Sequence, residues 1–173
     1  VNGRGRETSY SRIKDVRRDV PVVMMDYCFV GLEKDLGSTA TILVMAERES
    51  GAIEAAHIEA KGPALFPVDL IVKTLQHWGL ARVTLTDQEP AIVALAVAVQ
   101  VRREAETLVV HGPRHDSESK GAVENANLQL EGLLRTLVQT VEHHYDVTIG
   151  PGHPILGWKV RHAGWLLTRY AVK

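Results

Sequence analysis

Asp26, Asp87 and Glu124 are the residues of this sequence whose types and positions could support metal-dependent chemistry. Asp26 lies in the middle of a strongly apolar segment, residues 22–30. An ionised carboxylate that is buried without a partner is costly. Asp26 must therefore face water at a strand edge, lose its charge, pair with a cation or bind a metal ion, and the residue types leave these alternatives open.

The other two acids have equally plain structural explanations. Asp87 follows a short β-rich run, which is where open α/β sheets place ligands, but it could also cap the helix that begins near Pro90. Glu124 lies in the first turns of a long helix, on a polar stripe formed by Lys120, Glu124, Asn127, Glu131 and Arg135. This stripe could follow a phosphate backbone, although an exposed face with ion pairs four residues apart explains it too.

Hydrophobic periodicity predicts the elements that must position these acids. We expect strands over 20–32, 38–47, 52–59, 82–86 and 107–110, and helices over 67–78, 91–101, 120–143 and from 154 to the end. The helix over 91–101 is almost wholly apolar, so we expect it to be buried on nearly all sides. A three-stranded meander followed by βα units predicts an α/β domain with a mixed five-stranded sheet and helices on both faces.

Composition and charge limit the remaining possibilities. The chain has 173 residues, of which 45% are hydrophobic and 24% charged, as in a globular domain. Its longest apolar run has nine residues, whereas a membrane span needs about 20. The net charge is −1, but residues 1–18 hold six Lys or Arg against two acids, and residues 158–173 hold four against none. We interpret 1–19 as a basic linker or arm and 20–173 as the domain.

Other chemistry-bearing residues give weaker signals. One cysteine, Cys28, excludes an internal disulfide, favours a reducing, intracellular compartment, and is best interpreted as a small buried apolar residue. His111 and His115 flank Gly-Pro and do not form a helical zinc pair. Trp158 and Trp165 could stack on bases, but their seven-residue spacing favours packing in the core or at a dimer contact.

Three sequence segments together resemble the catalytic core of retroviral-type integrases, of a copia-like LTR-retrotransposon branch. They are the string Ser119 to Asn127 (SKGAVENAN), the strand with Asp26, and Thr86-Asp87-Gln88-Glu89-Pro90. The resemblance implies an RNase H-like fold over about 20–170 and a catalytic triad of Asp26, Asp87 and Glu124 that binds two Mg²⁺ or Mn²⁺ ions. It also implies nucleic-acid contacts by Arg114, Ser119, Lys120, Asn127 and Arg135.

The implied activity is DNA integration by a polynucleotidyl transferase, which trims the ends of an element's DNA and joins them to target DNA in the nucleus. The implied partners are DNA, further copies of the chain and, in the parent polyprotein, an upstream zinc-binding domain; no membrane is involved. The interval between Asp87 and Glu124 is one residue longer than usual in the family, and Gln88-Glu89-Pro90 stands where many relatives have Asn-Gly followed by an acid. A decayed or domesticated core that only binds DNA or oligomerises, and a nuclease without strand transfer, are the alternatives.

Overall fold

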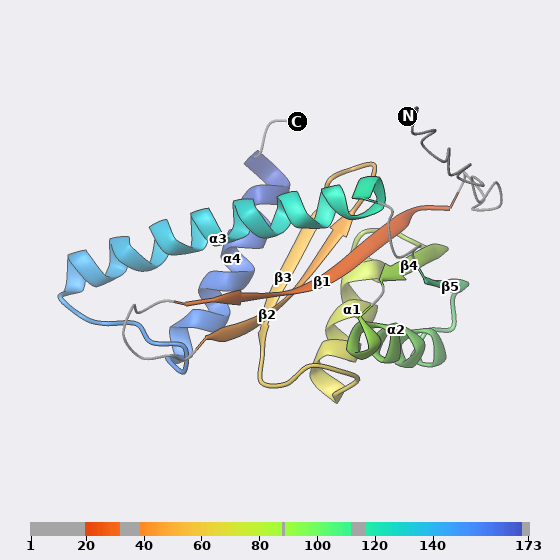
Figure 1. Cartoon of the computed structure of the whole chain (residues 1–173), viewed down its shortest axis with the longest axis horizontal. Helices are drawn as coiled ribbons and strands as arrows, with labels where there is room; N and C mark the ends of the chain where they lie inside the picture. The colour runs from red at the N-terminus through yellow and green to blue at the C-terminus, as the bar shows by residue number, and fades with distance from the viewer. Residues whose placement is uncertain (1–19, 32–38, 88, 112–116, 171–173) are drawn as a thin grey trace, which may run out of the picture.

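The computed structural model describes residues 20–31, 39–87, 89–111 and 117–170. For residues 86, 87, 111, 117–120 and 122 it describes the backbone alone. Within these residues the elements are β1 (Val22–Val30), β2 (Ala40–Glu47), β3 (Ile53–Ile58), α1 (Leu65–His77), β4 (Val83–Asp87), α2 (Pro90–Arg102), β5 (Thr107–His111), α3 (Ser117–Tyr145) and α4 (Pro154–Tyr170). Figure 1 shows their arrangement. The predicted basic arm, residues 1–19, lies outside the described residues.

The five strands form one mixed sheet in the order β3-β2-β1-β4-β5. The meander β1-β2-β3 is antiparallel, whereas β4 pairs in parallel with β1 and β5 pairs in parallel with β4. The predicted fold class is therefore confirmed. This order places β1, with Asp26, at the centre of the sheet and β4, with Asp87, directly beside it.

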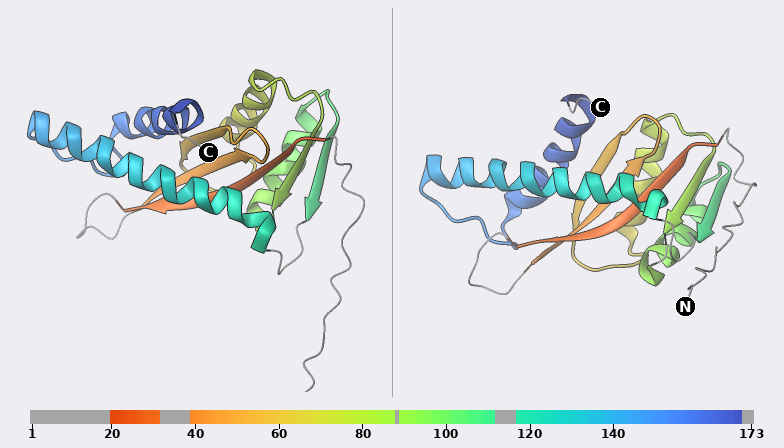
Figure 2. Two further views of the ribbon diagram at one scale, coloured as in Figure 1. Left: turned by 90° about the horizontal axis from the view of Figure 1, so that it is seen from above. Right: turned by 45° about the horizontal axis from the view of Figure 1, so that its top comes forward.

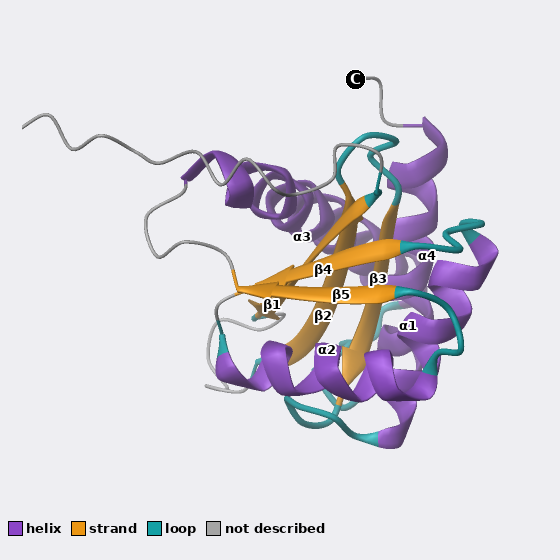
Figure 3. Ribbon diagram, turned by 90° about the vertical axis from the view of Figure 1, so that its right-hand side faces the viewer, coloured by secondary structure: helices purple, strands orange, loops and turns teal. Residues whose placement is uncertain are grey.

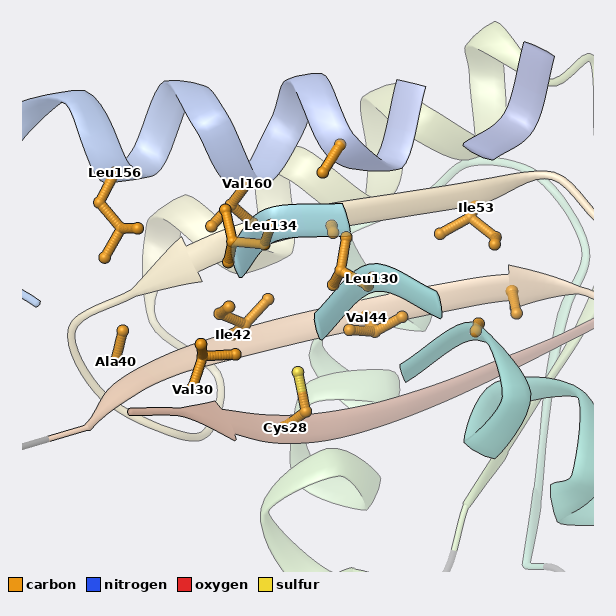
Figure 4. Packing of buried hydrophobic residues seen from close by; sticks show 14 of the residues in the cluster. Cys28, Val30, Ala40, Ile42, Val44, Ile53, Leu130, Leu134, Leu156 and Val160 are labelled. Carbon is orange, nitrogen blue, oxygen red and sulfur yellow. The ribbon is translucent and has the colours of Figure 1, made fainter. Parts of the chain in front are cut away.

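The helices cover the two faces of the sheet in pairs, α1 and α2 on one face and α3 and α4 on the other (Figure 3). Because side chains alternate along a strand, each face contributes its own apolar layer. Residues of β1 and β2 such as Cys28, Ile42 and Val44 pack against Leu130 and Leu134 of α3 (Figure 4). Met25 and Tyr27 point the other way, toward α1 and α2.

Two helices differ from the sequence-based expectation. The prediction that α2 is buried on nearly all sides was wrong: Ile92, Leu95 and Val99 are buried, but Val97 and Val101 are exposed. An apolar run has no periodic pattern to show which side meets the sheet. The second difference is α3, which begins at Ser117, three residues earlier than expected, and extends past the end of the sheet (Figure 2).

Within the described part of the chain, no helix combines the length and the apolar character that crossing a membrane requires.

Candidate active site

Asp26 is held in the middle of β1, partly buried, by contacts to two elements. It alternates along the strand with Met24 and Cys28, whose side chains belong to the layer under α3 and α4, so its carboxylate faces α3. Its Oδ1 accepts a hydrogen bond from the backbone N–H of Tyr27 at 2.8 Å. Its Oδ2 accepts one from Nδ2 of Asn127 at 2.9 Å. Asp26 is thus braced by its own strand and by α3.

The register of the sheet brings Asp87 next to this strand. Asp87 is the last residue of β4 and directly precedes residue 88, which the structure does not describe. The parallel pairing of β4 with β1 joins Thr86 to Met24, two residues before Asp26. The backbone of Asp87 therefore lies beside the Asp26 segment, at the carboxyl end of a parallel strand, where α/β sheets bind ligands.

Glu124 reaches the same region through α3. It is exposed and precedes Asn127 by three residues, and side chains with this spacing lie on the same side of a helix, one turn apart. Because Asn127 contacts Asp26 directly, the turn that carries Glu124 lies next to the Asp26 segment. The buried positions Val123, Ala126 and Leu130 fix this rotation of α3 by packing on the sheet.

The electrostatic effect of the acids is visible at Cys28. Burial raises the pKa of this thiol to about 12, and the carboxylates of Glu131 and Asp26 add to the rise. Cys28 is therefore protonated at neutral pH and behaves as the small buried apolar residue that the sequence predicts. Asp26 and Glu131 thus place negative charge on the side of β1 that faces α3.

The three acids provide the hard oxygen ligands that divalent cations such as Mg²⁺ prefer. One further observation is consistent with a bound water molecule or ion. Oδ1 of Asn127 is buried and accepts no hydrogen bond within the described residues. Buried polar atoms of this kind are usually satisfied by water or by an ion. Among the described side chains there is no cluster of three or more His, Cys, Asp or Glu residues, but Asp87 is outside that set.

The structure describes the side chains of only some of the residues predicted to contact nucleic acid. Arg114 lies outside the described residues, and Ser119 and Lys120 belong to the first turn of α3 without described side chains. Arg135 is exposed, pairs with Glu131 at 3.4 Å and lies about 16 Å along α3 from Glu124. Asn127, which we expected to position a DNA strand, has its amide N–H on Asp26. Its contact could not be foreseen, because it depends on how α3 docks.

Two of the basic residues near the carboxyl terminus, Lys159 and Arg161, make contacts within the fold. Lys159 is buried between α3 and α4, where its Nζ donates to the carbonyl oxygen of Leu137 at 2.8 Å and desolvation lowers its pKa. Arg161 lies 3.5 Å from the carboxylate of Glu54. These two cations stabilise the packing of α4 on its neighbours.

Sequence reasoning missed two residues near the acids, Lys61 and Glu89. They form an ion pair of 2.6 Å between the loop that follows β3 and the start of α2. Glu89 lies in the quoted Thr86–Pro90 motif, so its position beside Asp87 was visible. Lys61 lies in a loop, where no periodic pattern indicates a spatial partner.

Comparisons with known proteins find related structures but no related sequences: no family model and no curated protein sequence matches the chain. The catalytic core domain of BIV integrase is similar at TM-score 0.59 and 18% identity, over 88% of this chain and 86% of that one. The HTLV-2 integrase catalytic core domain, in complex with magnesium and in a dimeric form, is similar at TM-score 0.54 and 18% identity, over 91% and 93%.

A third similar structure is a chain of the simian T-cell lymphotropic virus intasome in complex with PP2A regulatory subunit B56 gamma. It matches at TM-score 0.61 and 16% identity, over 89% of this chain and 51% of that chain. Sequence identities this low establish a shared architecture and nothing finer. That architecture, which the sequence motifs had predicted, is the RNase H-like fold of the retroviral integrase catalytic cores.

Proposed function

We propose that this chain is a DNA-integrating polynucleotidyl transferase of the retroviral-integrase type, from a retroelement. One observation carries the proposal: the Asn127–Asp26 hydrogen bond links the α3 turn of Glu124 to the strand that lies beside the end of β4. Three acids far apart in sequence thereby come from adjoining elements. Chromosomal DNA is the proposed target, so the reaction belongs in the nucleus.

Asp26, Asp87 and Glu124 are the proposed ligands of divalent cations, with Mg²⁺ as the natural choice for an all-oxygen donor set. Two such ions, when bound, activate the attacking oxygen and stabilise the leaving oxygen of a phosphodiester. The HTLV-2 core is a magnesium complex, which supports this assignment. The attacking group is water when the element's end is trimmed and the resulting 3′-OH when it is joined to the target.

The protein's own contribution is to hold Asp26 in one orientation. The Tyr27 N–H and the Asn127 amide each occupy one lone pair of the carboxylate, one on each oxygen. Asn127 is in this scheme a positioning residue, while Lys120 and Arg135 remain proposed phosphate contacts.

We also propose that the chain acts as an oligomer through an aromatic face of α4. This face consists of Trp158, His162, Trp165 and Tyr170. Trp158 and Trp165 are 61% and 46% exposed, so the expectation that they pack in the core of the chain was wrong. Their rings lie nearly parallel to that of His162, with centroids 4.8 and 5.7 Å away.

The aromatic face combines exposed tryptophan rings with a neighbouring hollow, which suits an isologous contact between two copies. A hollow of about 530 Å³ lies beside Trp165, and Trp78, the C-cap residue of α1, and Ile53 of β3 also line it. Stacking covers the ring faces between Trp158 and Trp165, so a base cannot intercalate there. The dimeric form of the HTLV-2 core supports a second copy as the occupant.

The experiment that tests the catalytic proposal compares wild type with Glu124→Gln. Millimolar Mg²⁺ or Mn²⁺ is expected to raise the melting temperature of the wild type, because ions that bind only the native state stabilise it. Glu124→Gln should lose most of that rise and all end-trimming activity. Its stability without metal should change by no more than about 0.5 kcal/mol, as is usual for exposed positions.

Glu104→Gln is the matched control, since Glu104 is also exposed but lies between α2 and β5, away from the acids. It should behave as wild type. An equal metal response and equal activity in Glu124→Gln would remove Glu124 from the site. A wild type that neither responds to metal nor cuts DNA would identify a decayed core, and trimming without strand transfer would identify a nuclease.

A further inference from the structure

The loop between β3 and α1 contains a lysine, Lys61, that contacts β1 and the N-cap residue of α2, two residues after the end of β4. Its Nζ lies 2.6 Å from a carboxylate oxygen of Glu89. The same Nζ lies 4.9 Å from the ring centroid of Tyr27 and 4.8 Å from that of Phe29. Tyr27 directly follows Asp26, and Glu89 comes two residues after Asp87.

The contact to Glu89 fixes the start of α2. Glu89 is the N-cap residue of α2, and its carbonyl oxygen accepts hydrogen bonds from Ile92 and Val93, each at 3.0 Å. Its side chain makes no capping hydrogen bond, so the carboxylate is available for Lys61. The backbone that leaves β4 at Asp87 is therefore attached to the loop after β3 two residues later.

The contact to β1 is reinforced by the next residue of the loop. The backbone N–H of Gly62 donates to the hydroxyl oxygen of Tyr27 at 3.0 Å, in a buried position. Gly62 has φ of +103°, which a side chain would strain, so glycine permits this approach of the loop. The Tyr27 ring belongs to the apolar layer of α1 and α2, on the opposite side of β1 from the Asp26 carboxylate.

These contacts lie beyond the last described backbone pairing between β1 and β4. In the described residues the pairing of β1 with β4 covers three residue pairs and ends at Met24 and Thr86. Asp26 and Asp87 both follow that last pair along their strands. No direct β1–β4 pairing is described beyond that pair, and Lys61 connects the two segments further along their strands.

We propose that Lys61 is a positioning residue that sets the spacing of Asp26 and Asp87 for metal binding, through its ion pair with Glu89. The inference rests on the proposed function, because it concerns the metal site described there. The side chains of Lys61 and Glu89 are 34% and 33% exposed, so water screens the pair and its contribution to global stability is small. We expect the ion pair to affect metal binding by Asp26 and Asp87 instead.

A direct contact between Lys61 and a DNA phosphate is the competing explanation. Substitution of Glu89 distinguishes the two explanations. If Lys61 acts through Glu89, then Lys61→Met, Glu89→Gln and the double substitution should have equal effects, because each breaks the same link. If Lys61 binds phosphate, Glu89→Gln should leave the lysine charged and DNA binding intact. Lys61→Arg should restore function in the first case, because a guanidinium keeps both the ion pair and the ring contacts.

The experiment measures the Mg²⁺ or Mn²⁺ concentration that gives half of the metal-induced rise in melting temperature, for the complete chain and each variant. Lys61→Met and Glu89→Gln should raise this concentration on the order of ten-fold, the scale found for residues that support metal ligands. The melting temperature without metal should hardly change. Arg82→Met is the control, because Arg82 forms a comparable but more exposed ion pair with Glu106, 2.7 Å long, at the opposite end of β4.

Hydrogen exchange of the peptide spanning 85–92, measured without metal, makes the result independent of catalysis. Faster exchange in Lys61→Met and Glu89→Gln, but not in Arg82→Met, is expected. Unchanged exchange, or a metal response that Arg82→Met alters equally, would overturn the inference. So would weakened DNA binding in Lys61→Met with a normal metal response in Glu89→Gln. If the wild type shows no metal response, the proposed function fails, and the exchange result alone decides whether Lys61 holds the two segments.

Discussion

Thr84 and Thr107 are buried threonines on neighbouring strands whose hydroxyl groups have different surroundings. The Thr107 hydroxyl accepts a hydrogen bond from the Arg103 guanidinium at 2.9 Å and donates to the carbonyl oxygen of Ala105 at 3.1 Å. The Thr84 hydroxyl is buried and has no hydrogen-bond partner in the described structure. One hydroxyl supports the β5 end of the sheet, whereas the other is buried at a cost.

Thr84→Val should therefore stabilise the chain by about 1 kcal/mol, because it replaces an unsatisfied hydroxyl with a methyl group of similar size. Thr107→Val, the matched substitution, should destabilise it by about 1–2 kcal/mol, because the Arg103 guanidinium loses an acceptor. Urea unfolding of both variants measures the two changes in free energy. If Thr84→Val proves as destabilising as Thr107→Val, then water or an undescribed residue satisfies the Thr84 hydroxyl.

At the scale of single residues, the sequence predicted what a residue could do better than what it contacts. The burial of Cys28 was predicted from its place in an apolar strand and is confirmed. The role of Asn127 does not, because its partner is 101 residues away and depends on the docking of α3. Lys61 carries no sequence signal either, since its contacts are made by the path of a loop.

At the scale of elements, Gly164 explains how closely α4 approaches the sheet. A Cβ atom added at Gly164 would lie 3.1 Å from the backbone nitrogen of Ala55 and 3.4 Å from its Cβ. Ala55 is in β3, whose hydrogen bonds to β2 hold its backbone in place. Gly157, on the same helix, has no atom within 4 Å of an added Cβ.

Gly164→Ala is accordingly expected to cost about 1–3 kcal/mol through overpacking, despite the higher helix propensity of alanine. Gly157→Ala should instead stabilise the chain by as much as about 1 kcal/mol, since only the propensity changes. Thermal unfolding of the two variants tests the opposite signs. Equal stabilisation by both would mean that α4 can move away from β3 without loss.

The elements themselves were predictable wherever a periodic pattern existed. Alternating or continuous apolar runs identified all five strands, and helical periodicity identified α3 as a long helix. The orientation of α2 was missed because Ala91 to Val101 is apolar on every side. Its exposed residues Val97 and Val101 become evident only when the sheet and α1 are in place.

At the scale of the whole molecule, the α4 aromatic face yields a prediction about oligomeric state. Trp165→Glu introduces a charge beside the hollow and should shift the chain from dimer toward monomer, because a buried unpaired charge disfavours association. Val101→Glu is the control, since Val101 is 82% exposed on α2, on the other side of the sheet. It should leave the oligomeric state unchanged.

Sedimentation velocity over a range of protein concentrations measures both variants, and circular dichroism verifies that each remains folded. A wild type that is monomeric at every concentration would refute the oligomer. A dimer that persists in Trp165→Glu would place the contact on another face. The sequence alone left core and dimer packing open for Trp165, because a seven-residue spacing defines a helix face without identifying what meets it.

The order of β1, β4 and α3 along the chain has a consequence for protein synthesis. A nascent chain that has emerged as far as β5 already contains both strands that carry acids, but α3, which begins at Ser117, still follows. Glu124 and the amide that braces Asp26 are then missing together, since both belong to α3. On the proposed function, we therefore expect ribosome-bound or truncated chains that end before α3 to lack the activity on nucleic acids.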